Sequence, residues 1–271
     1  MGRLMIQFFR ISFTLLFLVT VTAEVSVQAK HSHGLEEGDT ALVSPDILFP
    51  TQFNLGLSEV NIREHTLESL KDKPTELVDY LKENTAKAVI GPKGKLYLID
   101  GHHITRAVSD SGLKEVHVEI VKDYSDLKPK EFWAKLADKE WLYLYDNGVL
   151  RPQSELPKTI REMTDDPFRT LAWLVRKVGG YEKVKTPFAE FKWGDYFRKK
   201  MKKIDLSTPK STQDALDRAL KLASSASDQD LPGAIGDGPK GLGTGAGDEC
   251  RKKYLELEAR LFPLIPHKAG N

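Results

Sequence analysis

The sequence predicts an α+β protein in which a small mixed α/β unit is followed by a helical subdomain. Between residues 45 and 127, short apolar runs typical of strands alternate with segments of helical spacing, which indicates the mixed unit. From Lys128 onward, apolar residues recur only at helical spacing, which indicates the helical subdomain. The chain of 271 residues is long enough to form one or two domains with packed cores.

Residues 1–29 have the pattern of a secretory signal peptide, because Arg3 and Arg10 precede an apolar run at 11–23. This run is shorter than the ~20 residues that span a bilayer, so a cleaved signal fits better than a permanent anchor. Cleavage is expected after Val27-Gln28-Ala29, and Val21-Thr22-Ala23 is a second candidate site. We therefore expect a secreted or periplasmic protein with no stable membrane span after cleavage.

The charge balance argues against one class of protein, and the cysteine content excludes one kind of stabilising bond. Removing residues 1–29 would leave 38 of the 40 basic residues and 38 of the 39 acidic residues, so the remaining chain is formally neutral. A dedicated nucleic-acid scavenger usually has a strong basic excess, so this balance argues against that class. Cys250 is the only cysteine, which excludes an intramolecular disulfide. Stability must therefore come from a packed core.

The mixed unit at 45–127 is expected to follow a polar, glycine-containing leader at 30–44 that is predicted to be flexible. Helices are expected where apolar residues recur at helical spacing, and strands where short apolar runs are bounded by turn residues. The expected elements are, in order, helices at 60–70 and 74–81, a strand at 88–90, a turn at 91–94, a strand at 96–99, a helix at 103–111 and a strand at 116–121.

The helical subdomain is expected over residues 128–223. Residues 132–141 and 168–175 each carry one apolar face, and Gly179-Gly180 is a stop signal for the second helix. Further along, Trp193, Tyr196 and Phe197 form an aromatic cluster of the kind that is usually part of a core.

The last part of the chain divides into a linker and a helix. Residues 224–248 are rich in Ser, Gly and Asp, and are predicted to be flexible. Residues 249–263 recover helical spacing, and we expect this C-terminal helix to dock on the rest of the molecule.

The most informative stretch is the strand-turn-helix at 96–108, LYLIDGHHITRAV. Gly101 lets the backbone approach a ligand closely, and the start of the following helix presents unpaired N–H groups to it. His102, His103 and Arg106 add donors, so the arrangement suits a phosphate-type anion. Asp100 could cap the helix, orient a histidine or hold a metal ion. The alternative is a turn that only caps a helix.

Motifs scattered over most of the chain share one resemblance. They are Phe49-Pro50-Thr51-Gln52, the run from Leu96 to His103, Phe132-Trp133, Asp166-Pro167-Phe168-Arg169 and the run from Pro187 to Trp193. Together they resemble the ParB-like nuclease family of the ParB/sulfiredoxin superfamily, over about residues 46–203. The resemblance implies a ParB/sulfiredoxin-like core in the mixed unit.

The resemblance also implies a phosphate site. In ParB-type domains a Gly-x-x-Arg-x-x-Arg-Ala box binds nucleotide phosphates, and Gly101, His103, Arg106 and Ala107 match it, with Thr105 inside the same stretch. Pro50-x-Gln52 resembles a second ParB segment and adds Thr51 and Gln52 as ligand-binding candidates. The weaker likeness of residues 165–169 to a Glu-Asn-x-x-Arg box adds Arg169.

Three functions are consistent with these residues. The first is a phosphodiester-cleaving enzyme, with His102 or His103 as general base and Arg106 stabilising the transition state. Asp100 would then orient a histidine or hold a divalent ion such as Mg²⁺. The ligand would be a nucleotide, a nucleic acid or another phosphate-bearing molecule.

The second function is a small-molecule phosphotransferase, because free serine kinases have a similar Asp-Gly-His-His turn. Their catalytic glutamate would fall at Gln52, whose amide cannot accept a proton, and Glu59 or Glu64 would have to replace it. The third is a non-catalytic module that binds an anion or another protein. The sequence indicates no particular protein partner.

Overall fold

The computed structural model describes residues 34–226, 231–236, 238, 241–242 and 247–262. The predicted signal peptide at 1–29, the first residues of the predicted leader and parts of the predicted linker at 224–248 lie outside these residues. Where the linker is described, the expectation of flexibility is wrong, because Ala226, Leu231, Ala234 and Leu242 are buried in an apolar core. Within the described part of the chain, no helix is both long enough and apolar enough to cross a bilayer.

A five-stranded mixed sheet forms the centre of the first unit, with strands in the order β1-β6-β4-β5-β2. The antiparallel pair β4 and β5 is joined at residues 92–94, where Lys93 and Gly94 both adopt positive φ angles of 63° and 70°. This confirms the predicted hairpin. The strands are β1 (Thr40–Val43), β2 (Leu48–Pro50), β4 (Ala86–Gly91), β5 (Lys95–Asp100) and β6 (Val116–Asp123).

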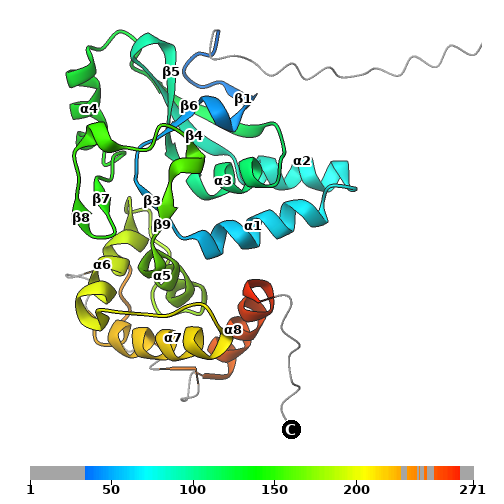
Figure 1. The fold of residues 1–271 in the computed structure, drawn as a ribbon, viewed down its shortest axis with the longest axis vertical. Helices are drawn as coiled ribbons and strands as arrows, with labels where there is room; N and C mark the ends of the chain where they lie inside the picture. The colour runs from blue at the N-terminus through cyan, green and yellow to red at the C-terminus, as the bar shows by residue number, and fades with distance from the viewer. Residues whose placement is uncertain (1–33, 227–230, 237, 239–240, 243–246, 263–271) are drawn as a thin grey trace, which may run out of the picture.

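Both faces of the sheet are covered, because side chains alternate along each strand. In β5, Leu96 and Leu98 face the core beneath α1 (Leu57–Ser69), α2 (Pro74–Glu83) and α3 (His102–Asp110). Tyr97, from the same strand, packs on the other side with Phe132 of α4 (Pro129–Asp138). Figure 1 shows these three helices on one side of the sheet and α4 beside it.

The expectation of a flexible leader at 30–44 is wrong for the described residues from Leu35 onward. Leu35 is buried in the core, and β1 pairs antiparallel with β6 at the edge of the sheet. The N–H of Gly38 also donates to the carbonyl of Ile120 at 2.8 Å. The four residues of β1 are too few, and its surroundings too polar, for the sequence pattern to reveal a strand that depends on pairing with β6.

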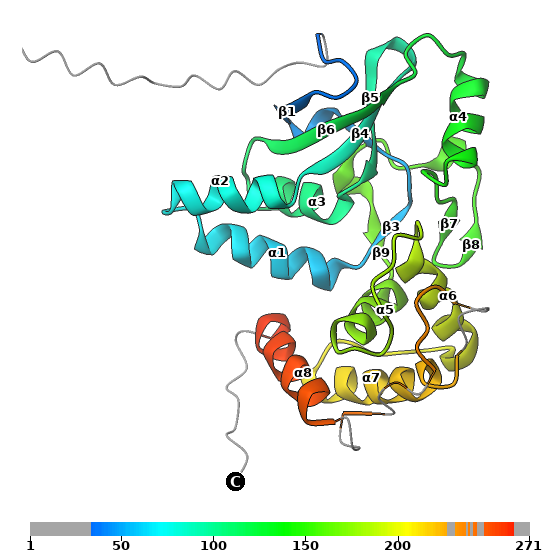
Figure 2. The same ribbon diagram turned by 180° about the vertical axis from the view of Figure 1, so that it is seen from behind.

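The second unit is built from α5 (Pro167–Lys177), α6 (Ala189–Met201), α7 (Pro209–Ala223) and α8 (Gly247–Leu261) around one apolar core. Trp193 and Phe197 lie in this core, as the sequence predicts, and the ring of Tyr181 stacks on Trp193. Both views place these helices together at one end of the molecule, away from the sheet (Figures 1 and 2).

The connection between the units differs from the expected all-helical extension at 128–223. It begins with α4, which packs on the sheet, and continues through a short hairpin of β7 (Tyr145–Asp146) and β8 (Val149–Leu150). β9 (Thr164–Asp165) then pairs in parallel with β3 (Asn54–Leu55), which directly precedes α1. These two-residue strands are too short to show a period of two, so the sequence could not reveal them. They hold the start of α5 beside the start of α1.

Candidate functional site

The predicted turn forms as expected, and its glycine is required by packing. Gly101 adopts φ 82°, between the end of β5 and the start of α3. A Cβ at this position would lie 2.7 Å from the Cα and Cβ of Ala86, so the turn is pressed against β4. The carboxylate of Asp100 accepts the N–H of Gly101 at 2.7 Å. Asp100 therefore stabilises the turn itself.

His102 is part of the core that supports the turn. It is 3% exposed, and its Nε2 accepts the backbone N–H of Thr51 at 3.4 Å. The hydroxyl of Thr51 donates to the carbonyl of Leu98 at 2.7 Å. Burial, together with the neighbouring His103, lowers the pKa of His102 to about 3, so the ring is neutral at pH 7. His102 and Thr51 thus fasten the end of β2 to the turn.

His103 points toward the start of α1. Its Nε2 accepts the N–H of Gly56, the N-cap residue of α1, at 3.1 Å. Burial lowers the pKa of His103 to about 4 despite the nearby carboxylate of Glu59. Since Nε2 accepts a hydrogen bond, the ring proton belongs on Nδ1. His103 is therefore a neutral side chain whose basic nitrogen lies 3.8 Å from Glu59 Oε2.

Glu59 is a buried carboxylate surrounded by basic groups. It lies in the first turn of α1 and is 7% exposed. Its Oε1 accepts from Arg63 Nη2 at 3.0 Å, and its Oε2 accepts from Arg169 Nη2 at 3.4 Å. Burial opposes the charge, but His103 and the two guanidinium groups hold the pKa of Glu59 at about 2. Glu59 is ionised at neutral pH.

Arg169 has unused hydrogen-bonding capacity. It lies in the first turn of α5, is 7% exposed and has its guanidinium carbon 5.6 Å from the ring centre of Phe191. Its Nε and Nη1 have no hydrogen-bond partner among the residues that the structure describes. Buried donors are rarely left unpaired, and a charged one is especially costly. Two donors of this buried cation are thus unpaired, although almost none of their surface is open in the ligand-free protein.

Arg106 has different surroundings. Its Nε pairs with Asp110 at 2.6 Å, and its Nη1 donates to the carbonyl of Met163 at 3.0 Å. The guanidinium therefore ties α3 to the segment before β9 and does not turn toward the start of its own helix. Thr105 is also occupied, because its hydroxyl donates to the carbonyl of Gly101 at 2.9 Å.

The structure thus brings together only some of the sequence-predicted candidates. His103, Glu59 and Arg169 converge, whereas His102 and Thr51 lie behind the turn. The buried side chain of Gln52 donates to the carbonyl of Asn54 at 2.7 Å, which fixes its amide to the backbone.

Sequence reasoning missed two residues of the convergent group. Arg63 lies one helical turn after Glu59, and this i, i+4 spacing was the available signal. Gly56 gave no signal, because its two roles depend on distant segments. Its N–H reaches His103, and a Cβ there would lie 2.8 Å from the hydroxyl oxygen of Thr170 on α5.

A polar network positions the start of α5, which carries Arg169. Asp166 caps this helix by accepting the N–H groups of Phe168 at 2.9 Å and Arg169 at 3.3 Å. Its other oxygen accepts from Arg198 at 2.6 Å, and Arg198 also pairs with Asp195.

Asp195 extends this network to Tyr143, whose hydroxyl donates to the Asp195 carboxylate at 2.9 Å. Burial and this carboxylate raise the pKa of Tyr143. The network reaches the residue after β2, because the N–H of Tyr143 donates to the carbonyl of Thr51 at 3.0 Å.

The residues do not fit the divalent ion considered for Asp100. In the described part of the chain, no group of three or more His, Cys, Asp or Glu side chains is arranged to hold a metal ion. The carboxylates nearest to the convergent group are engaged by arginines, and Asp100 bonds its own turn. We therefore assign no metal to this site.

Comparisons with known proteins match the region that contains these residues. A family model described as "Putative ParB-like nuclease" matches residues 42–199. The crystal structure of protein Atu1540 from Agrobacterium tumefaciens is similar, with 35% sequence identity and a TM-score of 0.62. That match covers 73% of this chain and 98% of the other. A search of curated proteins finds no match. Every residue of the convergent group and of the polar network lies within 42–199.

Proposed function

Because this chain belongs to the ParB-like nuclease family, we propose that it binds a phosphate-bearing ligand at Arg169 and His103, where the two units meet. The observation that carries this proposal is the buried Arg169 guanidinium, which has two unpaired donors. A phosphate oxygen would satisfy these donors through charge-assisted hydrogen bonds, which are among the strongest in proteins. The ligand would then lie on the side of α3 that faces α1 and α5, and not beside Arg106 as the sequence predicts.

The backbone around the site also favours an anion. Glu59, His103 and Arg169 lie in the first turns of α1, α3 and α5, respectively. The positive ends of three helix dipoles therefore meet at the same place. Glu59 balances only one of the two guanidinium groups that contact it, and His103 is neutral. Glu190 also interacts with Arg169 but is paired with Arg176 at 2.8 Å, so one positive charge remains for the ligand.

We further propose that the ligand is a phosphodiester and that the site hydrolyses it. In this reaction His103 Nε2 takes a proton from water, the water oxygen bonds to phosphorus, and the bond to the leaving oxygen breaks. The leaving oxygen keeps the electron pair of that bond and then takes the proton from His103. Arg169 stabilises the negative charge that builds up on the phosphate oxygens. His103 is unprotonated at neutral pH, as a base must be. Its pKa of about 4 makes it a weaker base than an ordinary histidine, and it has to release the Gly56 N–H first.

Two observations weigh against a phosphotransferase. Gln52, at the position of the kinase glutamate, donates its amide to a backbone carbonyl and cannot take a proton. Glu59, the nearest carboxylate, has a pKa of about 2 and is therefore a weak base. A module that binds phosphate without turnover remains the main competitor to the hydrolase.

The test is a pair of measurements on the full chain. Binding of inorganic phosphate is followed by calorimetry, and hydrolysis of bis(p-nitrophenyl) phosphate is followed by the release of nitrophenol. Binding and turnover that both decline in Arg169→Lys, with turnover abolished in His103→Gln, would support the hydrolase. Binding without turnover would leave a binding module. Absence of phosphate binding would refute both.

A further inference from the structure

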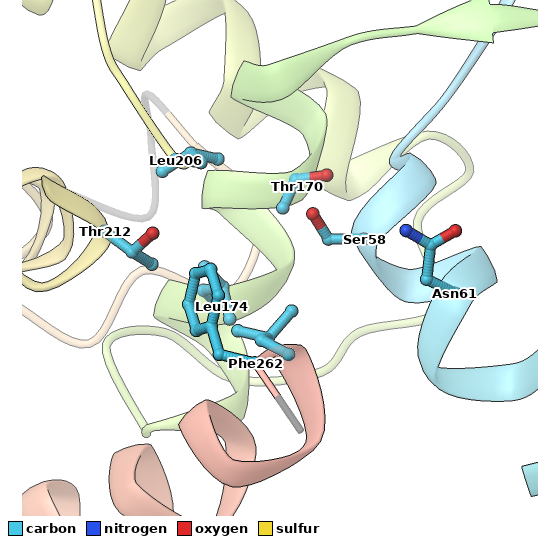
Figure 3. Close-up of a pocket in the computed structure, with 8 residues that line it drawn as sticks. Ser58, Asn61, Thr170, Leu174, Leu206, Thr212 and Phe262 are labelled. Atoms are coloured by element: carbon cyan, nitrogen blue, oxygen red, sulfur yellow. The ribbon is translucent and has the colours of Figure 1, made fainter. Parts of the chain in front are cut away.

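A second site, distinct from the proposed phosphate site, lies between the two units. A partly open cavity of about 160 Å³ is lined by residues of α1, α5, α7 and the end of α8 (Figure 3). Its polar wall includes Ser58, Thr170 and Thr212, and its apolar wall includes Leu174, Leu206 and Leu261. Ser58 and Thr170 directly neighbour Glu59 and Arg169 in the sequence, but neither of the latter residues lines the cavity.

Two hydroxyl groups at this cavity lack partners. Thr170 and Thr212 are each 1% exposed, and neither Oγ1 has a hydrogen-bond partner among the described residues. Threonines in helices usually satisfy their hydroxyl by donating to the carbonyl four residues earlier. Thr66 does so here, to Ile62, at 2.9 Å. Thr170 and Thr212 do not, so neither hydroxyl is paired with a described residue in the ligand-free protein.

The positions of the polar groups define what the ligand must offer. In Figure 3, the hydroxyl oxygens of Ser58 and Thr170 face each other from α1 and α5, while Thr212 approaches from α7 on the other side. A ligand that reaches both sides needs a hydrogen-bonding group at each end. Between them, leucines from α5, α8 and the segment before α7 require an apolar body.

Charge and size restrict the ligand further. None of the residues that line the cavity is charged, so an ionised ligand would lose its hydration without a counter-ion. A cavity of roughly 150 Å³ can hold a benzene ring. We propose that this cavity binds a small uncharged molecule with a ring-sized hydrocarbon body and a hydroxyl or carbonyl group at each end. Such a ligand would bridge α1 of the first unit and α5 and α7 of the second.

Calorimetric titration of the full chain tests this site with three probes of similar size. Resorcinol is uncharged with two hydroxyls, toluene has none, and benzoate is charged. We expect resorcinol to bind at least about tenfold more tightly than either of the others. Thr212→Val should weaken resorcinol binding by about two- to tenfold, the loss expected for one hydrogen bond. Thr170→Val is the second variant, with the same expectation.

The melting temperature provides a separate readout. Because its hydroxyl is buried and unpaired, Thr212→Val should raise the melting temperature of the ligand-free protein while weakening resorcinol binding. Thr85→Val is the control, since its hydroxyl donates to the carbonyl of Lys82 at 2.7 Å and the residue does not line the cavity. It should leave resorcinol binding unchanged. The proposal is overturned if no probe binds, if toluene binds as tightly as resorcinol, or if both cavity variants bind resorcinol like the parent.

Discussion

Arg169 of α5 donates through Nη2 to Glu59 of α1 at 3.4 Å, across the junction between the two units. The two residues are 110 positions apart in the chain. Their contact assembles a buried group in which one carboxylate meets two guanidinium groups and a neutral histidine. The other two nitrogens of the Arg169 guanidinium, Nε and Nη1, have no partner among the described residues.

Replacing the central carboxylate should be strongly destabilising. Glu59→Gln leaves the buried charges of Arg63 and Arg169 without their counter-ion, and breaking a buried ion pair in this way costs about 3–5 kcal/mol. The free energy of unfolding in urea is the measurement. Glu68→Gln is the matched control on the same helix, because its pairing with Lys71 is half exposed. It should change stability by less than about 1 kcal/mol. If Glu59→Gln lowered the free energy of unfolding by no more than Glu68→Gln does, the buried group would contribute nothing special to stability.

Stability should fall on acidification, beginning near pH 6.5. The pKa values of His102 and His103 are lowered to about 3 and about 4 in the folded protein, against 6.5 for an unperturbed histidine. Below pH 6.5 the unfolded chain therefore binds more protons than the folded protein does. Stability is fully present above pH 6.5 and is lost as the pH falls toward 4.

Urea unfolding between pH 7.5 and pH 4.5 measures this effect. His103→Gln should reduce the slope of unfolding free energy against pH, since it removes one of the two groups. His65→Gln, which changes an exposed histidine on α1, should keep the parental slope. An identical slope in His103→Gln and the parent would mean that His103 titrates normally in the folded protein.

Gly101→Ala should destabilise the turn through two separate effects. The residue needs a positive φ, which costs an L-residue about 1–2 kcal/mol, and its new methyl group would overlap Ala86. Gly112→Ala isolates the first effect, because Gly112 has φ 76° but nothing within 4 Å of a Cβ. Thermal unfolding should therefore show a clearly larger loss for Gly101→Ala. If the losses were the same, packing against β4 would not be the reason for this glycine.

Much of the first unit could be predicted from the sequence, because its signals are local. The hairpin of β4 and β5 follows from apolar runs around Gly91-Pro92-Lys93-Gly94, and α3 follows from the glycine turn before it. β1 could not be predicted, since its stability comes from pairing with β6, about 75 residues away. The pairing of β3 with β9 depends on a similar long-range contact.

The candidate site shows the same limit. His103 and Glu59 were identified as chemically active residues, and Arg169 entered through the family resemblance. The sequence could not decide between Arg106 and Arg169 as the anion ligand. Arg106 is occupied by Asp110 and by the carbonyl of Met163, 57 residues away, whereas Arg169 has donors to spare. That difference is set by tertiary contacts alone.

Export is predicted from the sequence alone, because residues 1–29 lie outside the described structure. An apolar run followed by two Val-x-Ala sequences predicts cleavage after Ala29 or Ala23. Intact-mass measurement of the protein recovered from the extracellular or periplasmic fraction should give a chain that begins at Lys30 or Glu24. A chain that still begins at Met1 would contradict both cleavage and the predicted location.

The most direct test of the phosphate site compares two arginines of the full chain. Calorimetric titration at low salt gives the dissociation constant for inorganic phosphate in the parent, Arg169→Lys and Arg106→Met. Lysine keeps the charge but lacks the guanidinium donors, so Arg169→Lys should weaken binding by about tenfold or more, as expected for lost hydrogen bonds to a charged group. Arg106→Met should bind phosphate like the parent. Loss of binding in Arg106→Met, with parental binding in Arg169→Lys, would contradict the proposed location of the site.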